Sequence, residues 1–349
     1  MKNISYLNKE KWKCRDSNIE LMRIVCLTMI VAHHMIIDSL FSVPQVLKTE
    51  GSISGLLGSA IILNGFCYVA VNCFILISGY FGIKFKLRGV YKLYLFCVFY
   101  SFIRFLISGG ELDKQCIYSI VLPFSHTSKW FITCYIILYL LSPLLNKAIE
   151  NLKKNEYVLV LIVLTISNLY FGFLWKKYNA DGYNVAQFVY LYFIGGYLRE
   201  YIDINTIKSH TALCGYIVCA LIFGGVSIIS HYVQIPIYRS LAYNNPFILF
   251  GSIFFFILFL KIKFKSTIIN WIASGAFAIY LAPEMPWRTY ASDFIISHNN
   301  VILLIILCIL YALSKSIIVL LVDKIRQSFF EYPILKLFDR ICKNVSLLH

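Results

Sequence analysis

Ten long runs of apolar residues divide this sequence, and they constrain its fold more than any other feature. A helix needs roughly 20 consecutive apolar residues to cross a bilayer core, and each helix satisfies its own backbone hydrogen bonds in lipid. The alternating pattern of a membrane β-barrel is missing from the sequence. We therefore predict an all-α, polytopic integral membrane protein with about ten transmembrane helices. The runs occupy 18–41, 56–82, 90–108, 129–146, 157–174, 184–199, 212–231, 246–262, 267–285 and 301–322.

Composition supports this prediction and argues against a nucleic-acid partner. Apolar residues make up 59% of the 349 residues and charged residues only 14%, whereas a soluble domain is about 25% charged. The net charge of +15 lies in short clusters between apolar runs, as in juxtamembrane loops, so we expect no nucleic-acid binding. Most of the eleven cysteines lie within apolar runs and none forms a CxxC pair. We interpret them as packing residues and expect no metal site.

The distribution of lysine and arginine predicts how the chain is oriented. If ten helices cross the membrane with both termini in the cytoplasm, the inner segments hold 22 Lys and Arg residues and the outer loops hold 7. This bias follows the positive-inside rule. We accordingly expect a cytoplasmic N-terminal segment at 1–16, a transmembrane domain at 17–322 and a cytoplasmic tail at 323–349. The first segment is polar and basic, and no small-residue cleavage site follows it.

The first apolar run carries five ionisable residues, which are expensive inside a membrane and therefore suggest a functional site. Arg23 and His34 are eleven residues apart, so on a helix they differ by about 20° in direction and about 16 Å in height. Glu20 and Asp38 fall within about 40° of the same face, while His33 points about 100° away. A structural alternative pairs Glu20 with Arg23 near the inner interface and gives His34 a hydrogen bond to a neighbouring helix.

Five motifs follow one another along the chain. The first, "IELMRIVCLTMIVAHH" at 19–34, has an arginine, ten residues and a histidine. The other motifs are "VNCFILISGYFGIK" (71–84), "KWFITCYIILYLLSPLLN" (129–146), "YFIGGYLR" (192–199) and "ASGAFAIYLAPEMPWR" (273–288). In this order they resemble acyltransferase family 3, which comprises bacterial membrane acyltransferases, and in particular its branch that modifies cell-surface polysaccharides. One departure concerns the last motif, where the family often has Tyr-Leu-Ile-His-Glu and this sequence has Pro283 in the histidine position.

The resemblance implies an O-acetyltransferase in the bacterial cytoplasmic membrane, with acetyl-CoA as donor and a polysaccharide or its lipid-linked precursor as acceptor. Such a reaction needs a base for the acceptor hydroxyl, and histidine suits this role near neutral pH. We therefore expect His34 to be the base and Asp38 to orient its ring or stabilise the imidazolium. Direct transfer is the favoured mechanism, while a covalent acyl-histidine remains the alternative. For Asp38, a solvated position at the outer boundary is a structural alternative.

Further site residues follow from charge and motif position. The donor carries phosphates, so we expect basic side chains near the cytoplasm to hold it: Arg23, Arg88 and Lys92. The loop that contains the last two also has a topological role. For the acceptor we expect motif and outer-end residues: Asn72, Ser78, Trp130, Glu284 and Arg288. Tryptophan can stack on a sugar, but it also gathers at membrane interfaces without a ligand.

Two other functions remain open on the sequence alone. A transporter or flippase of a glycan or small solute would also explain ten spans and buried charges, although it gives no reason for the spacing between Arg23 and His34. A non-catalytic sensor or scaffold would leave the intramembrane charges without a role. Besides the lipid bilayer, a second copy of the chain is a conceivable partner, and the sequence leaves the oligomeric state open.

Overall fold

The computed structural model describes residues 16–37, 55–111, 113–125, 129–233 and 241–343, and within these ranges the chain is helical and has no strand. The all-α prediction is therefore confirmed for the described part. The main elements are α2 (Ser17–Ile36), α4 (Gly55–Cys67), α5 (Ala70–Phe81), α6 (Leu87–Ser108), α7 (Lys114–Val121), α8 (Trp130–Asn151), α9 (Lys154–Ile166), η2 (Ser167–Leu174), α10 (Val185–Tyr201), α11 (Ser209–Tyr232), α12 (Pro246–Lys261), α13 (Thr267–Ala276), α14 (Ala278–Leu281), α15 (Trp287–His298), α16 (Val301–Arg326), η6 (Gln327–Glu331) and α17 (Tyr332–Lys343).

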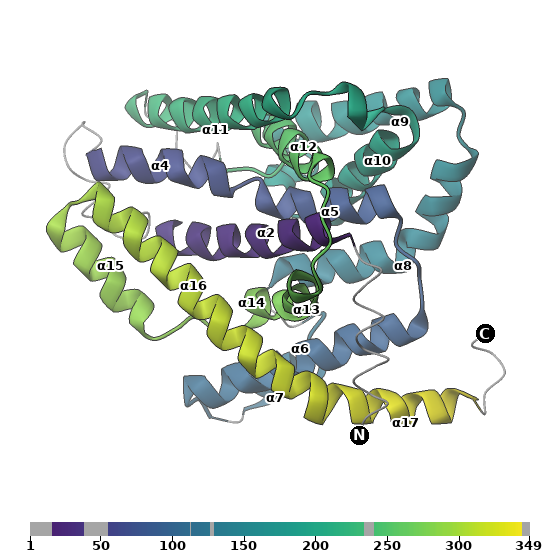
Figure 1. The fold of residues 1–349 in the computed structure, drawn as a ribbon, viewed down its shortest axis with the longest axis vertical. Helices are drawn as coiled ribbons and strands as arrows, with labels where there is room; N and C mark the ends of the chain where they lie inside the picture. Colours follow the sequence, from purple (N-terminus) through teal and green to yellow (C-terminus); the bar gives the residue numbers. More distant parts are fainter. Residues whose placement is uncertain (1–15, 38–54, 112, 126–128, 234–240, 344–349) are drawn as a thin grey trace.

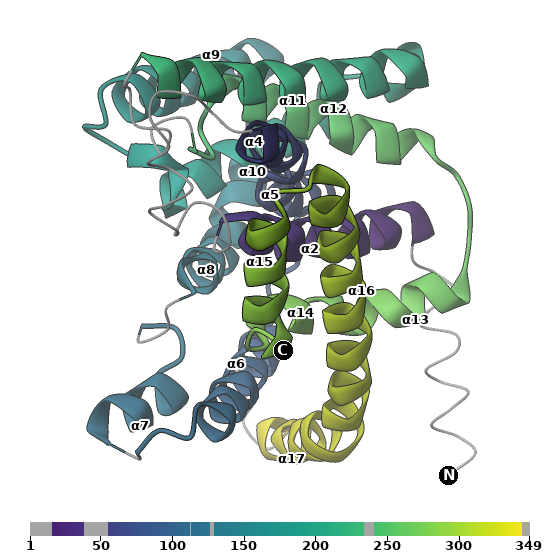
Figure 2. The same ribbon diagram turned by 90° about the vertical axis from the view of Figure 1, so that its left-hand side faces the viewer.

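Helix α2 runs through the middle of the bundle (Figures 1 and 2). It contacts α4, α5, α12, α13, α14 and α16. Its apolar side chains pack into the core, with Met22 and Cys26 completely buried. In contrast, α9 lies at the periphery and exposes Leu159 and Val163, as expected for a helix that faces lipid. The helix with the charged face is thus the one enclosed by the others.

Among the described residues, seven helical segments are long and apolar enough to cross a membrane. Of the remaining predicted spans, 246–262 and 267–285 correspond to shorter apolar helices, and 184–199 corresponds to α10, which has 17 residues. The prediction of a multi-pass helical membrane protein is therefore confirmed, while the count of ten and the cytoplasmic termini stay predictions. The seven segments are Ser17–Ile36, Gly55–Phe81, Leu87–Ser108, Trp130–Asn151, Lys154–Leu174, Ser209–Ser230 and Val301–Ile341.

Two of the predicted spans are interrupted. A turn at Tyr68 and Val69 separates α4 from α5, and the Ser252 hydroxyl donates to the carbonyl of Val69 at 3.3 Å. The run 267–285 breaks into α13 and α14, and the helix ends at Leu281. Irregular backbone is tolerated at membrane depth where it is buried in protein or lines a cavity. The first break places Tyr68 beside the site described below.

The predicted boundary at residue 322 falls inside α16, which continues to Arg326 and is followed directly by η6 and α17. Asp323 and Arg326 are buried in the core of the molecule. The first part of the segment 323–349 is therefore packed against the rest of the protein. Its location on the cytoplasmic side stays a prediction.

Candidate active site

The side chain of His34 borders a cavity of about 160 Å³ inside the bundle. α2 supplies one side of this cavity, and the residue before the start of α8 supplies another through Lys129. Because the rest of the wall is largely aromatic, the cavity offers both flat apolar surfaces and a few polar groups, which is typical of a small-molecule site. The lining residues are Ile30, His33, His34, Val71, Lys129, Trp130, Phe131, Tyr183, Tyr243 and Tyr280.

Three lining rings, those of Trp130, Tyr183 and Tyr243, form one connected wall of the cavity, and Tyr68 packs against this wall without lining the cavity itself. The rings of Tyr68 and Tyr243 are stacked with their centroids 4.6 Å apart. Trp130 packs on Tyr183 at 4.8 Å and on Tyr243 at 5.4 Å. The hydroxyl of Tyr68 hydrogen-bonds the hydroxyl of Tyr183 at 3.0 Å and donates to the carbonyl of Leu241 at 2.9 Å. Ring packing holds all four side chains, and the hydrogen bonds of Tyr68 and Tyr183 add polar contacts to two of them.

Asn72 supports this wall from behind. Its side-chain amide donates to the carbonyl of Tyr243 at 2.9 Å, and the amide of Gln187 donates to the same carbonyl at 3.0 Å. Both amides are buried. Asn72, which we predicted to bind the acceptor, therefore holds a wall residue in position and does not line the cavity.

The two adjacent histidines differ in their surroundings. His33 is buried, and its Nδ1 hydrogen-bonds Oδ1 of Asn64 on α4 at 2.6 Å. His33 therefore bonds to a neighbouring helix. The ring of His33 also meets the ring of Tyr68 edge-on at 5.0 Å. His34 makes no hydrogen bond to any residue that the structure describes, and it lines the cavity.

Several charged side chains act on His34 from other elements. They are Lys129, Glu284, Lys315 and Arg288. Glu284 follows α14, and its Oε2 accepts hydrogen bonds from Nζ of Lys315 at 2.7 Å and from the hydroxyl of Tyr311 at 2.7 Å. The Lys315 side chain is only 2% exposed. One carboxylate therefore holds a buried ammonium group near His34, and the surroundings of the histidine carry more positive than negative charge.

Arg23 lies away from the cavity, nearer the N-terminal end of α2. Its Nη1 forms an ion pair with Oε1 of Glu20 at 2.6 Å, which is the contact that the structural alternative predicts. The guanidinium side chain remains 36% exposed. The hydroxyl of Ser78 donates to the carbonyl of Phe74 at 2.9 Å, and Ser78 does not line the cavity of His34. Asp38 lies outside the described residues.

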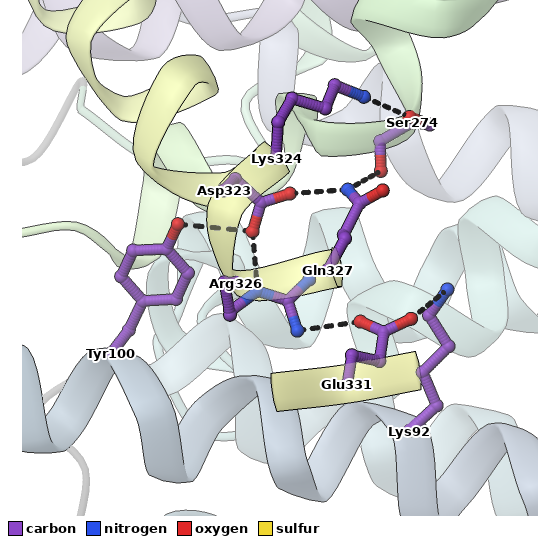
Figure 3. Close-up of polar contacts among 8 residues, drawn as sticks. All are labelled: Lys92, Tyr100, Ser274, Asp323, Lys324, Arg326, Gln327 and Glu331. Carbon is purple, nitrogen blue, oxygen red and sulfur yellow. Dashed lines mark hydrogen bonds and ion pairs between the residues drawn. The ribbon is translucent and has the colours of Figure 1, made fainter. Parts of the chain in front are cut away.

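The two basic residues predicted to bind the donor on α6 are paired with acidic residues of the C-terminal segment. Arg88 contacts Asp339 at 2.8 Å. Lys92 contacts Glu331 at 2.8 Å, as Figure 3 shows. Glu331 is buried and is also paired with Arg326 at 2.6 Å. A donor phosphate would have to displace these carboxylates. Donor binding by Arg88 and Lys92 stays a prediction.

The same cluster continues into the core through Asp323 (Figure 3). This carboxylate accepts hydrogen bonds from Arg326 at 2.6 Å, from Gln327 at 2.6 Å and from the hydroxyl of Tyr100 at 3.1 Å. Because Tyr100 lies on α6, the cluster fastens α16 and η6 to α6. A buried and paired cluster of this kind is a structural feature, and none of its members borders the cavity of His34.

Sequence reasoning found part of the site and missed the rest. Of the predicted acceptor residues, Trp130 lines the cavity, and Glu284 and Arg288 act on His34. The sequence pattern did not indicate Tyr68 or Tyr243, and it gave no role for Lys315. Within the described ranges, no three His, Cys, Asp or Glu side chains are grouped as they would be for a metal ion.

Comparison with known proteins gives one clear result. The model of a protein family described as an acyltransferase domain matches residues 16–321 of the chain. The match covers both α2 and the helices that surround His34. No curated protein and no solved structure shows significant similarity to the chain.

Proposed function

The chain belongs to acyltransferase family 3, and from this membership we propose that it is a membrane O-acetyltransferase. The donor is acetyl-CoA, and the acceptor is a hydroxyl of a cell-surface polysaccharide or of its lipid-linked precursor. The observation that carries the proposal is the position of His34, which borders an aromatic cavity with its ring free of hydrogen bonds to the described residues. A general base must reach the proton that it removes, and His34 lines the space a substrate would enter.

In the proposed reaction His34 acts as the base. The imidazole takes the proton of the acceptor hydroxyl while the oxygen attacks the carbonyl carbon of the thioester. The tetrahedral intermediate then collapses and breaks the carbon–sulfur bond. The imidazolium returns the proton to the departing thiolate, so the acetyl ester and free CoA are formed and the histidine is regenerated.

The charges around the cavity suit the developing oxyanion. Lys129, Lys315 and Arg288 act on His34, and cations placed in advance near a tetrahedral intermediate lower its energy. Glu284 fixes the ammonium group of Lys315 at 2.7 Å. We assign Glu284 and Lys315 as a positioning pair, in which the carboxylate keeps a buried cation in reach of the site. Pro283, the departure from the family pattern, precedes this carboxylate directly.

The aromatic wall suits a sugar acceptor. A pyranose ring has apolar C–H faces and polar edges, and Trp130, Tyr183 and Tyr243 offer flat rings together with hydroxyl groups. Such amphipathic rings supply large contact area with specific polar handles. The acceptor hydroxyl would then approach His34 from the side of this wall.

The donor would approach His34 along α2 from the end where Arg23 lies. The two residues share one face of the helix and are about 16 Å apart along its axis. Arg23 can therefore hold a polar part of the donor while the thioester lies at His34. Its pairing with Glu20 keeps the guanidinium in place.

The test is group transfer by purified protein in proteoliposomes. Acetyl-CoA labelled in its acetyl group is supplied with oligosaccharide acceptors, and the products are analysed for a labelled, hydroxylamine-sensitive ester. The proposal predicts such an ester and the release of free CoA. A transporter would move a solute across the bilayer without covalent change, and that result, with acetyl-CoA left intact, would replace the proposal with the transport function.

A further inference from the structure

A second and larger cavity, of about 640 Å³, lies at the N-terminal end of α2. It is an open groove between the start of α2, the end of α5 and the connection from α12 to α13, which passes the end of α2 in Figures 1 and 2. No function assigned above uses this groove. The lining residues are Asp16, Asn18, Ile19, Tyr80, Phe81, Leu260, Ile262, Lys263, Phe264 and Lys265.

The frame of the groove is fixed by hydrogen bonds at both ends of the α12–α13 connection. Ser17 is buried, and its Oγ accepts a hydrogen bond from the backbone N–H of Ser266 at 2.7 Å. Asn18 donates from its side-chain amide to the carbonyl of Phe259 at 2.9 Å. The connection is thus tied to α2 before and after its groove-lining residues, Leu260 and 262–265. A shape that exists before a ligand arrives reduces the entropy lost on binding.

The lysines of this connection divide into two kinds. Lys261 donates to the carbonyls of Ile204 and Asn205 at 3.2 and 3.1 Å. Lys263 and Lys265 line the groove and are exposed. Neither has a hydrogen bond or an ion pair with the residues that the structure describes. The groove therefore carries two cations that form no ion pair with the described residues, unlike Arg88 and Lys92, which are paired. One carboxylate, that of Asp16, also lines the groove, so the lining carries a net positive charge.

We propose that this groove binds the nucleotide end of coenzyme A, and that Lys263 and Lys265 contact its phosphates. The inference rests on the acyl-CoA donor of the proposed function. The phosphates of the donor need cations, and lysine is a common phosphate ligand. The adenine ring needs a flat apolar surface, which Tyr80, Phe81 and Phe264 offer between them. The groove thus supplies both chemistries that an adenine nucleotide requires.

The location of the groove agrees with the route to His34. Ile19 lines the groove, and Arg23 follows it by four residues on the same side of α2, which places Arg23 about one helical turn deeper. His34 lies about 16 Å beyond Arg23 on that face. The pantetheine arm of the donor is a long, unbranched chain that leads from the nucleotide to the thioester. A nucleotide in the groove would therefore direct this arm along α2 toward the catalytic histidine.

The experiment compares two donors and two charge-reversal variants. Lys263→Glu/Lys265→Glu reverses both charges in the groove. The control, Lys208→Glu, reverses an exposed lysine that does not line the groove. KM is measured for acetyl-CoA and for acetyl-pantetheine, which has the same thioester but no nucleotide, and binding of CoA is measured by calorimetry.

We expect the double variant to raise KM for acetyl-CoA and the Kd for CoA on the order of tenfold or more, since two charge-assisted contacts are replaced by repulsion. Its kinetics with acetyl-pantetheine should match those of the wild type, which also shows that the variant is folded. Equal effects of the double variant and the control on acetyl-CoA would overturn the inference while leaving the acyltransferase function intact. Wild-type protein that cleaves neither thioester would instead overturn the proposed function itself.

Discussion

The ion pair between Glu284 and Lys315 provides a prediction about stability whose size follows from burial. The two groups meet at 2.7 Å, and the Lys315 side chain is 2% exposed whereas that of Glu284 is 26% exposed. Removal of one member of a buried pair costs about 3–5 kcal/mol, because the other charge stays buried and uncompensated. The two single substitutions should therefore lower the free energy of unfolding by different amounts.

Glu284→Met should lower the free energy of unfolding more than Lys315→Met does, by an amount near the upper end of about 3–5 kcal/mol. It leaves the buried ammonium of Lys315 without its carboxylate, and Arg104 and Arg288 add to the repulsion there. For Lys315→Met, the loss of unfolding free energy should lie near or below the lower end of that range. The carboxylate of Glu284 keeps its contact with water and its hydrogen bond from Tyr311. Substituting both by methionine removes both charges, so the double variant should be close to the wild type.

The measurement is the free energy of unfolding in mixed detergent micelles, followed by tryptophan fluorescence for the wild type, both single variants and the double variant. The expected coupling energy is at least about 2 kcal/mol, as is found for contacting residues. Additive effects of the two substitutions, or a Lys315→Met variant as stable as the wild type, would refute the reasoning that a buried pair joins α16 to the segment after α14.

Three other predictions concern single side chains. Asn64→Leu should lower the free energy of unfolding by about 1–3 kcal/mol, because it strands Nδ1 of buried His33, and its unfolding transition checks this. Trp130→Ala should raise KM for the acceptor about three- to tenfold through loss of stacking, while KM for acetyl-CoA stays unchanged in steady-state assays. Gly79→Ala should sharply reduce the yield of monodisperse protein in size exclusion, since a Cβ there would lie 2.2 Å from the carbonyl oxygen of Tyr192; a normal yield would contradict the close packing of α5 on α10.

The helices could be predicted from the sequence because lipid imposes a simple rule on each segment separately. Apolar length alone locates α2, α6, α8 and α11. The breaks were not predictable in this way, since Tyr68 and Val69 lie within an uninterrupted apolar run and their turn depends on contacts with α12. Apolar length also gives no information on where a helix ends: α16 passes residue 322, and the buried Asp323 accepts a hydrogen bond from Tyr100 on α6.

Which charged residues lie on the same side was predictable only where they belong to one helix. Arg23 and His34 share a face of α2, and helical periodicity shows this directly. Lys315 and Glu284 meet across 31 positions of sequence, and no periodic pattern connects them. Arg88 illustrates the opposite case: its charge suggested a phosphate ligand, but the fold brings Asp339 to it from 251 residues away. Partners from distant helices decide which charged residues remain open to a substrate.

The central claim is that His34 removes the proton of the acceptor. The most direct measurement is the rate of acetyl transfer to an oligosaccharide by the wild type, by His34→Gln and by the control His298→Gln, each shown to be monodisperse and able to bind CoA. His298 is exposed and lies outside the cavity. The account predicts that His34→Gln loses about a hundredfold or more in kcat while it retains CoA binding, and that the control transfers acetyl groups at the wild-type rate. Equal rates for all three proteins would contradict the assignment of His34 as the base.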